Sequence, residues 1–321
     1  MRIGIVGAGM AGLACAEGLT RRGHDVVLFD KGRGPGGRMS TRRIATSAGE
    51  AFFDHGAQYF TVRDAAFGQR VEVWISQGVA APWPSAGSDA FVGVPAMNSA
   101  VRQMAVGLSV HRTALVTRIE SLGRGWRLIL DQGEAVEVDI AVVATPAEQS
   151  SALLASIAPH LAARARATPS APCWTAMLAF PEPVAVAQNC WRGVGAIGWA
   201  ARNNSKPGRV GPESWVVQAS PDWSRAHLEA DPDWVADTLK GALSNLLGAA
   251  LPPVAGQSSQ RWRFARSGAE GSEAIFDRDR RVGICGDWLI GPRVEAAWLS
   301  GAKLAEQIIV DGGYDLARSA S

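Results

Sequence analysis

The start of the chain alternates between short apolar runs and a helical pattern. Residues 2–6 (RIGIV) form an apolar run typical of a buried strand. Apolar residues at helical spacing follow over residues 10–22 and end at Gly23, and residues 25–30 (DVVLFD) form a second apolar run. This order of strand, helix and strand within about 30 residues is typical of a βαβ unit.

The next regions predict a β-rich insert, followed by a helix and by further strand-like segments. Residues 109–145 form several short strand patterns separated by the turn signals GRG and DQGE, and the last of them, DIAVVA, is typical of a buried strand. Residues 146–168 are rich in alanine and favour a helix. Residues 170–220 contain strand-like pieces that are interrupted by Pro and Gly.

The last third of the chain returns to helix and strand signals. Residues 231–250 predict a helix with Asp231 as its N-cap and Pro232 in its first position. Residues 281–288 (RVGICGDW) are typical of a strand, and a final helix is predicted near 294–309.

Composition narrows the class of protein. The chain has 321 residues, 47% of them hydrophobic and 19% charged, which indicates a folded protein with one large or two ordinary domains. A net charge of +2 gives no reason to expect nucleic acid. No apolar run of about 18 residues and no secretion signal is present, so we expect no membrane association and a cytoplasmic location. Four scattered cysteines favour neither a disulfide framework nor a metal site.

A glycine-rich segment links the first strand to the first helix. Gly7, Gly9 and Gly12 follow the pattern G-x-G-x-x-G, and Asp30 ends the second strand. In this context the glycines allow a tight turn and let a pyrophosphate approach the helix N-terminus, while the acid accepts hydrogen bonds from a ribose. The segment therefore predicts a dinucleotide site.

The acid is followed by an unusual run of glycine and arginine, LFDKGRGPGGRMSTRR over residues 28–43. A nicotinamide dehydrogenase continues from this acid into ordinary βα units. Arginines bordered by glycine can instead fold over the pyrophosphate of an extended cofactor such as FAD. A flexible basic loop is the alternative explanation.

Several motifs in order resemble one family. GAGMAGLACA, FDKGRGPGGRMSTRR, FDHGAQYFTVRD, VVATP, ICGDW and VEAAWLSG resemble the FAD-dependent amine-oxidase superfamily. WAARNNSKPGR, WVVQASPDWSRAHL and RWRFAR make the chain similar to the bacterial renalase branch of that superfamily, over nearly its whole length.

The resemblance implies non-covalently bound FAD and assigns a set of residues to it. The pyrophosphate would meet Gly7, Gly9, Met10, Ala11 and Gly12, the adenosine would meet Asp30, Lys31 and Val116, and Arg38 would cross the phosphates. The isoalloxazine and its ribityl chain would meet Ala57, Gln58, Thr145, Gly286, Asp287 and Val294. Cys285 is expected to be a buried thiol and not a flavin attachment point.

The resemblance also suggests a substrate side. The candidate substrate-binding residues are Gln58, Tyr59, Phe60, Arg202, Asn203, Gln260 and Trp288. Bacterial renalases tend to carry histidine where this chain has Gln218 and Gln260, so the substrate could be bound differently. For Arg202 and Asn203 a salt-bridged loop is an equally good explanation. We expect Lys206, which precedes Pro and Gly, to lie in a surface loop, and His55 to be structural.

Two tyrosines, one of them in a Gly-flanked tail, cannot form the aromatic pair of monoamine oxidases. The resemblance to the renalase branch implies oxidation of dihydronicotinamide isomers, aberrant forms of NADH or NADPH, with O2 as electron acceptor. No certain catalytic side chain is assigned, because a dihydropyridine donates hydride without a general base. The alternatives are an amine or other small-molecule oxidase, and a flavin-binding redox or scaffold protein with little turnover. The sequence leaves the oligomeric state open.

These observations predict an α/β fold. A Rossmann-type FAD-binding domain, with a parallel sheet and a β-meander insert, would comprise residues 1–68, 107–150 and 276–316. A discontinuous α+β substrate domain would comprise residues 69–106 and 151–275.

Overall fold

The structure is a computed structural model that describes residues 1–34, 36–193 and 195–319, with the backbone alone for residues 311–319. The chain forms two compact units. Unit 1 comprises Met1–Gly37, Val101–Ser170 and the chain from Ser267 onward, and unit 2 comprises Arg38–Ala100 and Ala171–Arg266.

Unit 1 is built on a six-stranded sheet with the order β18-β19-β12-β1-β2-β8. Five strands are parallel, and only β18 runs antiparallel to its neighbour β19. The strands are β1 (Arg2–Val6), β2 (Asp25–Phe29), β8 (Ser109–His111), β12 (Ile140–Val143), β18 (Ile275–Asp277) and β19 (Val282–Ile284). The predicted α/β fold with a Rossmann-type parallel sheet is confirmed.

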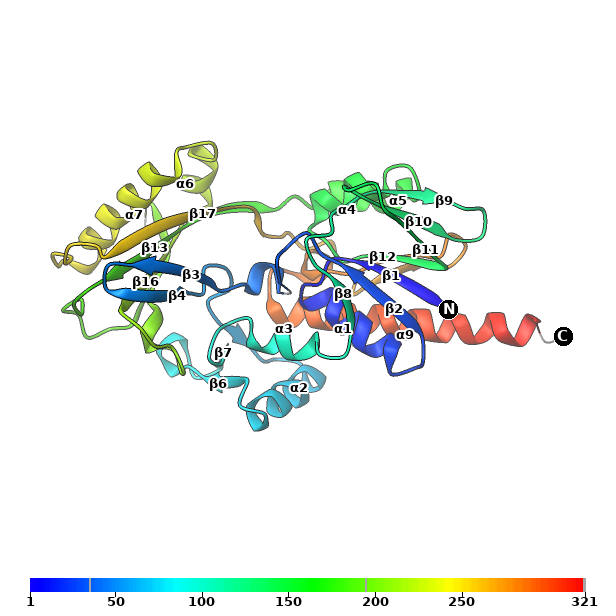
Figure 1. The fold of residues 1–321 in the computed structure, drawn as a ribbon, viewed down its shortest axis with the longest axis horizontal. Coiled ribbons are helices and arrows are strands. Elements are labelled where there is room, and N and C mark those ends of the chain that lie inside the picture. The colour runs from blue at the N-terminus through cyan, green and yellow to red at the C-terminus, as the bar shows by residue number, and fades with distance from the viewer. Residues whose placement is uncertain (35, 194, 320–321) are drawn as a thin grey trace. The chain divides into compact units, whose positions relative to one another are not determined.

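Helix α1 (Met10–Thr20) joins β1 to β2 and lies along α9 (Val294–Ser319), as Figure 1 shows. Glycines allow this close packing. A Cβ on Gly18 would lie 2.7 Å from the Cβ of Ala305, and a Cβ on Gly301 would lie 2.0 Å from the carbonyl oxygen of Ala11. Helix α9 begins where the sequence predicts and continues to Ser319, about three turns beyond the predicted end at residue 309.

The β-meander of unit 1 packs against two helices. Its strands are β9 (Val116–Ser121), β10 (Trp126–Leu130) and β11 (Ala135–Val138), and the helices are α4 (Ala147–Leu154) and α5 (Pro159–Arg166). Ile119 and Leu128 share one hydrophobic cluster with Leu154 and Leu161. The sequence predicts one helical segment here, whereas the structure has two, because Pro159 begins a new helix.

Unit 2 is built on a five-stranded antiparallel sheet with the order β14-β15-β16-β13-β17. The strands are β13 (Ala171–Phe180), β14 (Cys190–Arg192), β15 (Ile197–Arg202), β16 (Glu213–Ala219) and β17 (Gly256–Arg266). One face carries Trp174, Ala176 and Leu178 and is covered by α7 (Pro232–Leu247). The Asp231 side chain caps α7 by accepting hydrogen bonds from the backbone of Asp233 and Trp234, as predicted.

The opposite face of this sheet is covered at one end by the hairpin of β3 (Arg42–Thr46) and β4 (Gly49–Phe53). Phe53 and Ala51 pack there against Met177, Ala179 and Val216, and Ile44 packs against this cluster. The remaining elements of the chain are η1 (Gly37–Met39), β5 (Phe60–Thr61), α2 (Ala65–Ser76), β6 (Ala80–Pro82), η2 (Pro84–Ala86), β7 (Ala90–Gly93), α3 (Ser99–Met104), η3 (Asn203–Ser205), α6 (Pro221–Ala226) and α8 (Asp287–Ile290).

The two units differ from the predicted domain ranges in four places. Two are short, since residues 101–106 and 267–275 belong to unit 1 and not to the unit that contains the predicted substrate domain. Residues 38–68 belong to unit 2, because the β3–β4 hairpin buries its apolar side on the five-stranded sheet. Residues 151–170 belong to unit 1, because α4 and α5 pack on the meander. The predicted strand over residues 281–288 is shorter than expected, since α8 begins at Asp287.

Candidate functional site

The glycine-rich turn of unit 1 has the backbone that a dinucleotide site requires. Gly7 has a φ of +106°, and a Cβ on Gly12 would lie 2.0 Å from the carbonyl oxygen of Gly7. A Cβ on Gly9 would meet nothing within 4 Å, and Gly9 caps α1 without any side-chain hydrogen bond. The N-cap residue thus offers no side chain to the first N–H groups of α1, which leaves them for a phosphate.

Asp30 lies at the end of β2, beside this turn. Its carboxylate accepts a hydrogen bond from the Ala8 backbone at 2.7 Å and another from the Gly32 backbone at 2.7 Å. An ionised carboxylate has about four lone-pair sites, so two remain for ribose hydroxyls. The glycine-rich segment after it folds back on the turn, since Gly36 donates to the carbonyl oxygen of Ala8 at 3.1 Å.

Other predicted cofactor residues lie at the same edge of the sheet. Strands β1, β12 and β19 are parallel neighbours, so Gly7, Thr145 and Gly286 all follow carboxyl ends of strands. The Gly286 backbone donates to Ser300 Oγ at 2.9 Å, and Asp287 accepts from Ser267 Oγ at 3.0 Å. This arrangement fits an extended dinucleotide cofactor at the edge of unit 1.

The remaining predicted residues of unit 1 differ in exposure. Lys31 is exposed, Val294 is partly buried at the start of α9, and Met10, Ala11 and Val116 are at most 5% exposed. Trp288 is fully buried in the hydrophobic core, and its Nε1 donates to the Thr145 carbonyl oxygen at 3.2 Å. We therefore leave Trp288 out of the proposed substrate surface.

Two cysteines that are far apart in the sequence meet in unit 1. Cys15 and Cys285 are both fully buried, and a hydrogen bond from Cys285 together with burial raises the pKa of the Cys15 thiol well above its usual range. The Cys15 thiol therefore stays protonated, and Cys285 is buried, as expected.

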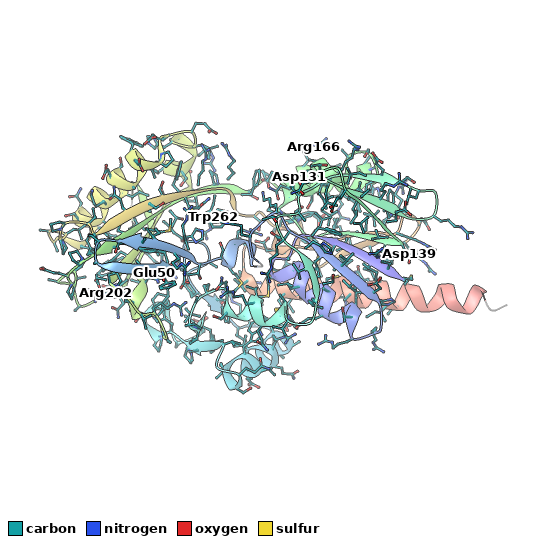
Figure 2. The ribbon with its side chains drawn as sticks, viewed as in Figure 1. Glu50, Asp131, Asp139, Arg166, Arg202 and Trp262 are labelled. Carbon is teal, nitrogen blue, oxygen red and sulfur yellow. The ribbon has the colours of Figure 1, made fainter. Side chains whose placement is uncertain are left out.

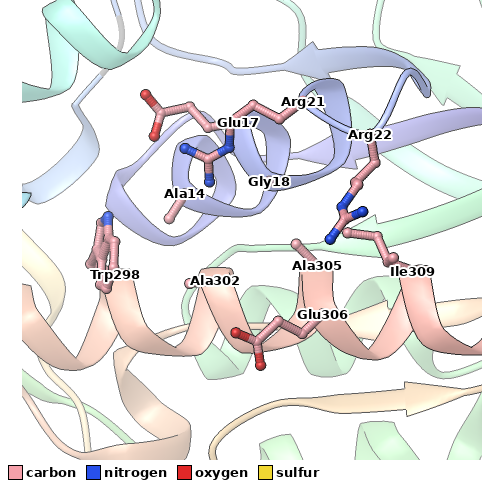
Figure 3. Close-up of a pocket in the computed structure, with 10 residues that line it drawn as sticks. All are labelled: Ala14, Glu17, Gly18, Arg21, Arg22, Trp298, Ala302, Ala305, Glu306 and Ile309. Carbon is pink, nitrogen blue, oxygen red and sulfur yellow. The ribbon is translucent and has the colours of Figure 1, made fainter. Parts of the chain in front are cut away.

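A hollow of about 310 Å³ lies between α1 and α9 and is shown in Figure 3. Small residues such as Ala14 and Gly18 form its floor, and Glu17, Arg21 and Glu306 lie around it. None of the predicted cofactor or substrate residues lines it, so we do not assign it to the reaction.

In unit 2, four side chains form a row across the five-stranded sheet. Thr175 of β13 pairs with Gln218 of β16 on one side and with Gln260 of β17 on the other, and Gln218 pairs with Trp199 of β15. Directly paired residues project to the same face of a sheet. Gln218 and Gln260 therefore lie on one face, on either side of the same threonine. We call these four residues the amide row.

The segment from Asp54 to Phe60, here called the 54–60 turn, is held against the amide row. Gln218 Nε2 donates to the Gly56 carbonyl oxygen at 2.7 Å, and the ring of Tyr59 lies 5.5 Å from that of Trp199. Trp262, labelled in Figure 2, donates to the His55 carbonyl oxygen at 2.9 Å. The structure therefore brings together the predicted residues Gln58, Tyr59 and Gln260 with Gln218.

Glycine is required at position 56. A Cβ there would lie 1.9 Å from the carbonyl oxygen of Arg38, and the next residue, Ala57, donates its backbone N–H to the same oxygen at 2.8 Å. The Arg38 side chain in turn donates to the Ala265 carbonyl oxygen at 3.2 Å. Residues 38, 56 and 57 are thus tied together within unit 2.

Two guanidinium groups lie beside the amide row. Arg42 Nη1 is 3.4 Å from Gln260 Oε1, and Arg192 stacks over Trp199 with its Nη2 3.3 Å from the Tyr59 hydroxyl. Within the part of the chain that the structure describes, neither arginine has a carboxylate in ion-pair range. Burial and the charge of Arg42 lower the pKa of His55 to about 4, so this imidazole is neutral at pH 7.

Two other predicted substrate residues have structural roles. Arg202 of β15, labelled in Figure 2, is three residues from Trp199 and so projects to the opposite face. There it pairs with Glu213 at 2.9 Å and lies over Trp215. Asn203 is 1% exposed, and its amide bonds the backbone of Phe52 and Asp54. The salt-bridge explanation is the one that the structure supports for Arg202.

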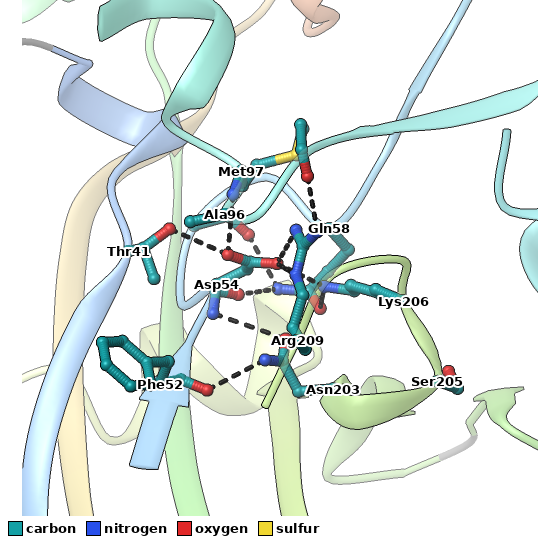
Figure 4. A network of polar contacts seen from close by, with 12 residues as sticks. Thr41, Phe52, Asp54, Gln58, Ala96, Met97, Asn203, Ser205, Lys206 and Arg209 are labelled. Atoms are coloured by element: carbon teal, nitrogen blue, oxygen red, sulfur yellow. Dashed lines mark hydrogen bonds and ion pairs between the residues drawn. The ribbon is translucent and has the colours of Figure 1, made fainter. Parts of the chain in front are cut away.

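The expectation that Lys206 lies in a surface loop is wrong. Its side chain is fully buried and its Nζ lies 3.2 Å from Asp54 Oδ2, while Arg209 Nη2 lies 2.6 Å from the same oxygen (Figure 4). Pro207 and Gly208 favour an exposed loop, but the residues on either side of them, Lys206 and Arg209, both contact the buried Asp54 carboxylate. Burial lowers the pKa of Lys206 to about 8, against the opposing attraction of Asp54.

The Asp54 carboxylate is saturated by its surroundings. Its Oδ1 accepts from Thr41 Oγ1 at 2.8 Å and from the Met97 backbone at 3.0 Å, and its Oδ2 accepts from both cations. Although burial opposes it, the attraction of Lys206 and Arg209 holds the pKa of Asp54 well below its usual range. One carboxylate therefore faces two buried cations, and the excess charge of this cluster is positive. No group of three or more His, Cys, Asp and Glu side chains suited to a metal occurs among the described residues.

Comparisons with known proteins agree with this fold and with the cofactor edge of unit 1. Residues 5–69 match the NAD(P)-binding Rossmann-like domain, and residues 81–309 match the family of flavin containing amine oxidoreductases. Since the second match covers most of the chain, the protein belongs to that family. The family is described as one of flavin-containing oxidoreductases.

Similar structures are found over nearly the whole chain. One assigned as a protoporphyrinogen oxidase from Exiguobacterium sp. 255-15 has a TM-score of 0.74 and 12% identity, covering 97% of this chain and 99% of that chain. Cyclohexylamine oxidase from Brevibacterium oxydans IH-35A has a TM-score of 0.70 and 12% identity, covering 96% and 98%. At this identity the likeness shows the fold alone.

Curated relatives match a short segment only. The zeta-carotene-forming phytoene desaturase of Myxococcus xanthus is 49% identical over 43 residues, which are 13% of this chain and 8% of the desaturase. In the described residues no helix has both the length and the apolar character needed to cross a membrane.

Proposed function

We propose that the protein is an FAD-dependent oxidase of dihydronicotinamide isomers that uses O2 as electron acceptor. The observation that carries this proposal is the amide row, in which uncharged hydrogen-bonding groups and aromatic rings gather on one face. Amide side chains can pair with a carboxamide as both donors and acceptors. FAD, when bound, would accept a hydride from the substrate and pass its electrons to O2.

The residues proposed to hold FAD fall into two sets. Unit 1 would hold the dinucleotide portion without a covalent bond, through the Gly7–Gly12 turn, Asp30 and the strand ends at Thr145 and Gly286. Ala57 and Gln58 of the 54–60 turn would lie beside the isoalloxazine. The chemistry needs no side chain to remove a proton, and the imidazole nearest this face, His55, is held by burial and by contact with Trp262.

Charge favours this substrate over an amine. A protonated amine entering this face would meet Arg42 and Arg192, while the carboxylate of Asp54 is already bonded to two cations. A nicotinamide mononucleotide or dinucleotide carries phosphate and is attracted by the same guanidinium groups. The proposed alternative, an amine oxidase, is the activity that two of the structural neighbours carry in their names.

Anaerobic mixing with each substrate class tests the proposal. The flavin of the purified protein should bleach with a dihydronicotinamide isomer and remain oxidised with primary amines such as cyclohexylamine or putrescine. Bleaching by an amine alone would refute this proposal and support the alternative, an amine oxidase. Bleaching by neither would support a flavin-binding protein with little turnover.

A further inference from the structure

The buried cluster of Asp54, Lys206 and Arg209 contacts the 54–60 turn at Asp54, the first residue of the turn, and again at the amide of Gln58. Lys206 Nζ lies 3.2 Å from Gln58 Oε1 as well as from Asp54 Oδ2. An ammonium group only donates hydrogen bonds, so the oxygen of the Gln58 amide must face Lys206. The amide nitrogen then points the other way.

The amide nitrogen of Gln58 closes the 54–60 turn. It donates to the carbonyl oxygen of Asp54 and, at 3.1 Å, to that of Gly56 (Figure 4). The Gly56 carbonyl also accepts from Gln218 of the amide row. A chain of hydrogen bonds therefore runs from Lys206 through Gln58 and Gly56 to the amide row.

We propose that Lys206 is a positioning residue, which fixes the 54–60 turn against the amide row by orienting the Gln58 amide. Lys206 does not touch the substrate in this role. If the amide were free to rotate, it would exchange its two donors for an acceptor, and the carbonyl oxygens of Asp54 and Gly56 would lose a partner. The consequence for substrate rests on the proposed function, whereas the consequence for the turn does not.

Removal of Lys206 is compatible with folding. In Lys206→Met, Asp54 keeps its bonds to Arg209, Thr41 and Met97, and the buried cluster becomes electrically neutral. The long apolar side chain of Met can lie along Trp83, whose ring is 5.3 Å from the Lys206 ammonium.

Three variants separate the hydrogen bond from the charge. Lys206→Met removes both, Lys206→Gln keeps a donor for Gln58 and removes the charge, and Gln58→Met removes the amide and leaves the ion cluster intact. The matched control is Lys240→Met, because Lys240 belongs to the same unit and pairs with Asp237 at the surface.

Hydrogen–deuterium exchange of the FAD-loaded proteins tests the positioning role directly. In Lys206→Met and Gln58→Met the amide hydrogens of residues 55–59 should exchange at least about 10-fold faster, as expected from the loss of two hydrogen bonds. Lys206→Gln should stay within about 3-fold of the unmodified protein, and Lys240→Met should not change. Unchanged exchange in either Met variant would overturn the proposal. An equal increase of the exchange rate in Lys206→Gln and Lys206→Met would also overturn it, since the charge and not the hydrogen bond would then hold the turn.

Anaerobic flavin reduction by a dihydronicotinamide isomer gives the second readout. Lys206→Met should lower the limiting reduction rate, and Lys206→Gln should restore most of it. If no isomer reduces the flavin of the unmodified protein, the proposed function fails while the exchange result still decides the role of Lys206. A Lys206→Met variant with faster exchange but a normal reduction rate would overturn the link between the turn and the reaction.

Discussion

Replacing Asp54 by Asn should strongly destabilise the protein, because Lys206 and Arg209 would lose their shared counter-charge. Three donor atoms contact Asp54 Oδ2, at 3.2 Å from Lys206 Nζ and at 2.6 and 3.2 Å from Arg209 Nη2 and Nε. Asn retains an oxygen for the Thr41 hydroxyl and the Met97 backbone, but it removes the negative charge and places an NH2 donor where Lys206 and Arg209 need an acceptor.

The magnitude follows from burial. The side chains of Asp54, Lys206 and Arg209 are 1%, 0% and 2% exposed, so water cannot take over the role of the carboxylate. Breaking a buried ion pair by removing one partner costs about 3–5 kcal/mol, in contrast to about 0–1 kcal/mol at a surface. We expect a loss in the upper of these ranges, because two cations are left without a counter-charge.

Equilibrium urea unfolding at pH 7, followed by tryptophan fluorescence, measures this loss. The double variant Asp54→Asn, Lys206→Met should be more stable than Asp54→Asn alone, since it leaves one uncompensated cation in place of two. Asp237→Asn, which breaks an exposed pair with Lys240, serves as the control and should shift the midpoint far less. A loss below about 1 kcal/mol for Asp54→Asn would refute the reasoning, and so would a double variant that is no more stable than the single one.

Three further predictions concern pH and the cofactor. Between pH 8 and 10.5 Lys206 keeps its proton in the unfolded chain and loses it in the folded chain, so the free energy of unfolding should rise with pH. Relative to Lys206→Met, the rise in urea unfolding should reach up to about 1.4 kcal/mol per pH unit, and a constant difference would contradict the lowered pKa of Lys206. Asp30→Asn should weaken FAD binding by about 1.5–3 kcal/mol in a fluorescence titration, through the loss of charge-assisted bonds to ribose, and equal affinity would show that Asp30 is not the ribose ligand. The rate of anaerobic flavin reduction by a dihydronicotinamide isomer should vary less than about twofold between pH 6 and 7.5, whereas in Gln260→His this rate should change with pH near the histidine pKa of about 6.5. A steep pH dependence of the rate in the unmodified protein would indicate another proton-transferring group.

The parts of the site that are local in sequence could be predicted. The Gly7–Gly12 turn follows from one strand, one helix and one acid within a single βαβ unit, and the structure has each element in place. The cap at Asp231 is equally local, since it depends on the backbone of the next three residues. In both cases the signal and the structure lie within one segment of chain.

The ion cluster could not be predicted, because its partners are distant in sequence. Lys206 and Asp54 are 152 positions apart, and nothing near Lys206 indicates a carboxylate. The adjacent Pro and Gly favour exposure when they are considered alone. One feature of the sequence does set Lys206 apart from most other cations: it is one of only four lysines, in a chain whose other cations are all arginine.

The alignment of Gln218 with Gln260 depends on strand register. Gln218 lies in a region with predicted strand-like pieces, whereas the sequence predicts no strand around Gln260, and their common neighbour Thr175 follows only from the pairing of three strands. A shift of one residue in either pairing would have sent one glutamine to the face covered by α7. For the same reason Arg202, three positions from Trp199, could not be excluded from the site before the sheet was known.

The packing of α1 on α9 sets an order of events during synthesis. Helix α1 is translated long before α9, and Gly18 and Ala11 meet Ala305 and Gly301 only after about 290 further residues have been made. At roughly 5–20 residues per second the N-terminal strand and helix wait on the order of 15–60 s for them. During this interval the intervening unit 2 segments can already form their sheet, so α1 is translated before these segments and gains its partner helix after them.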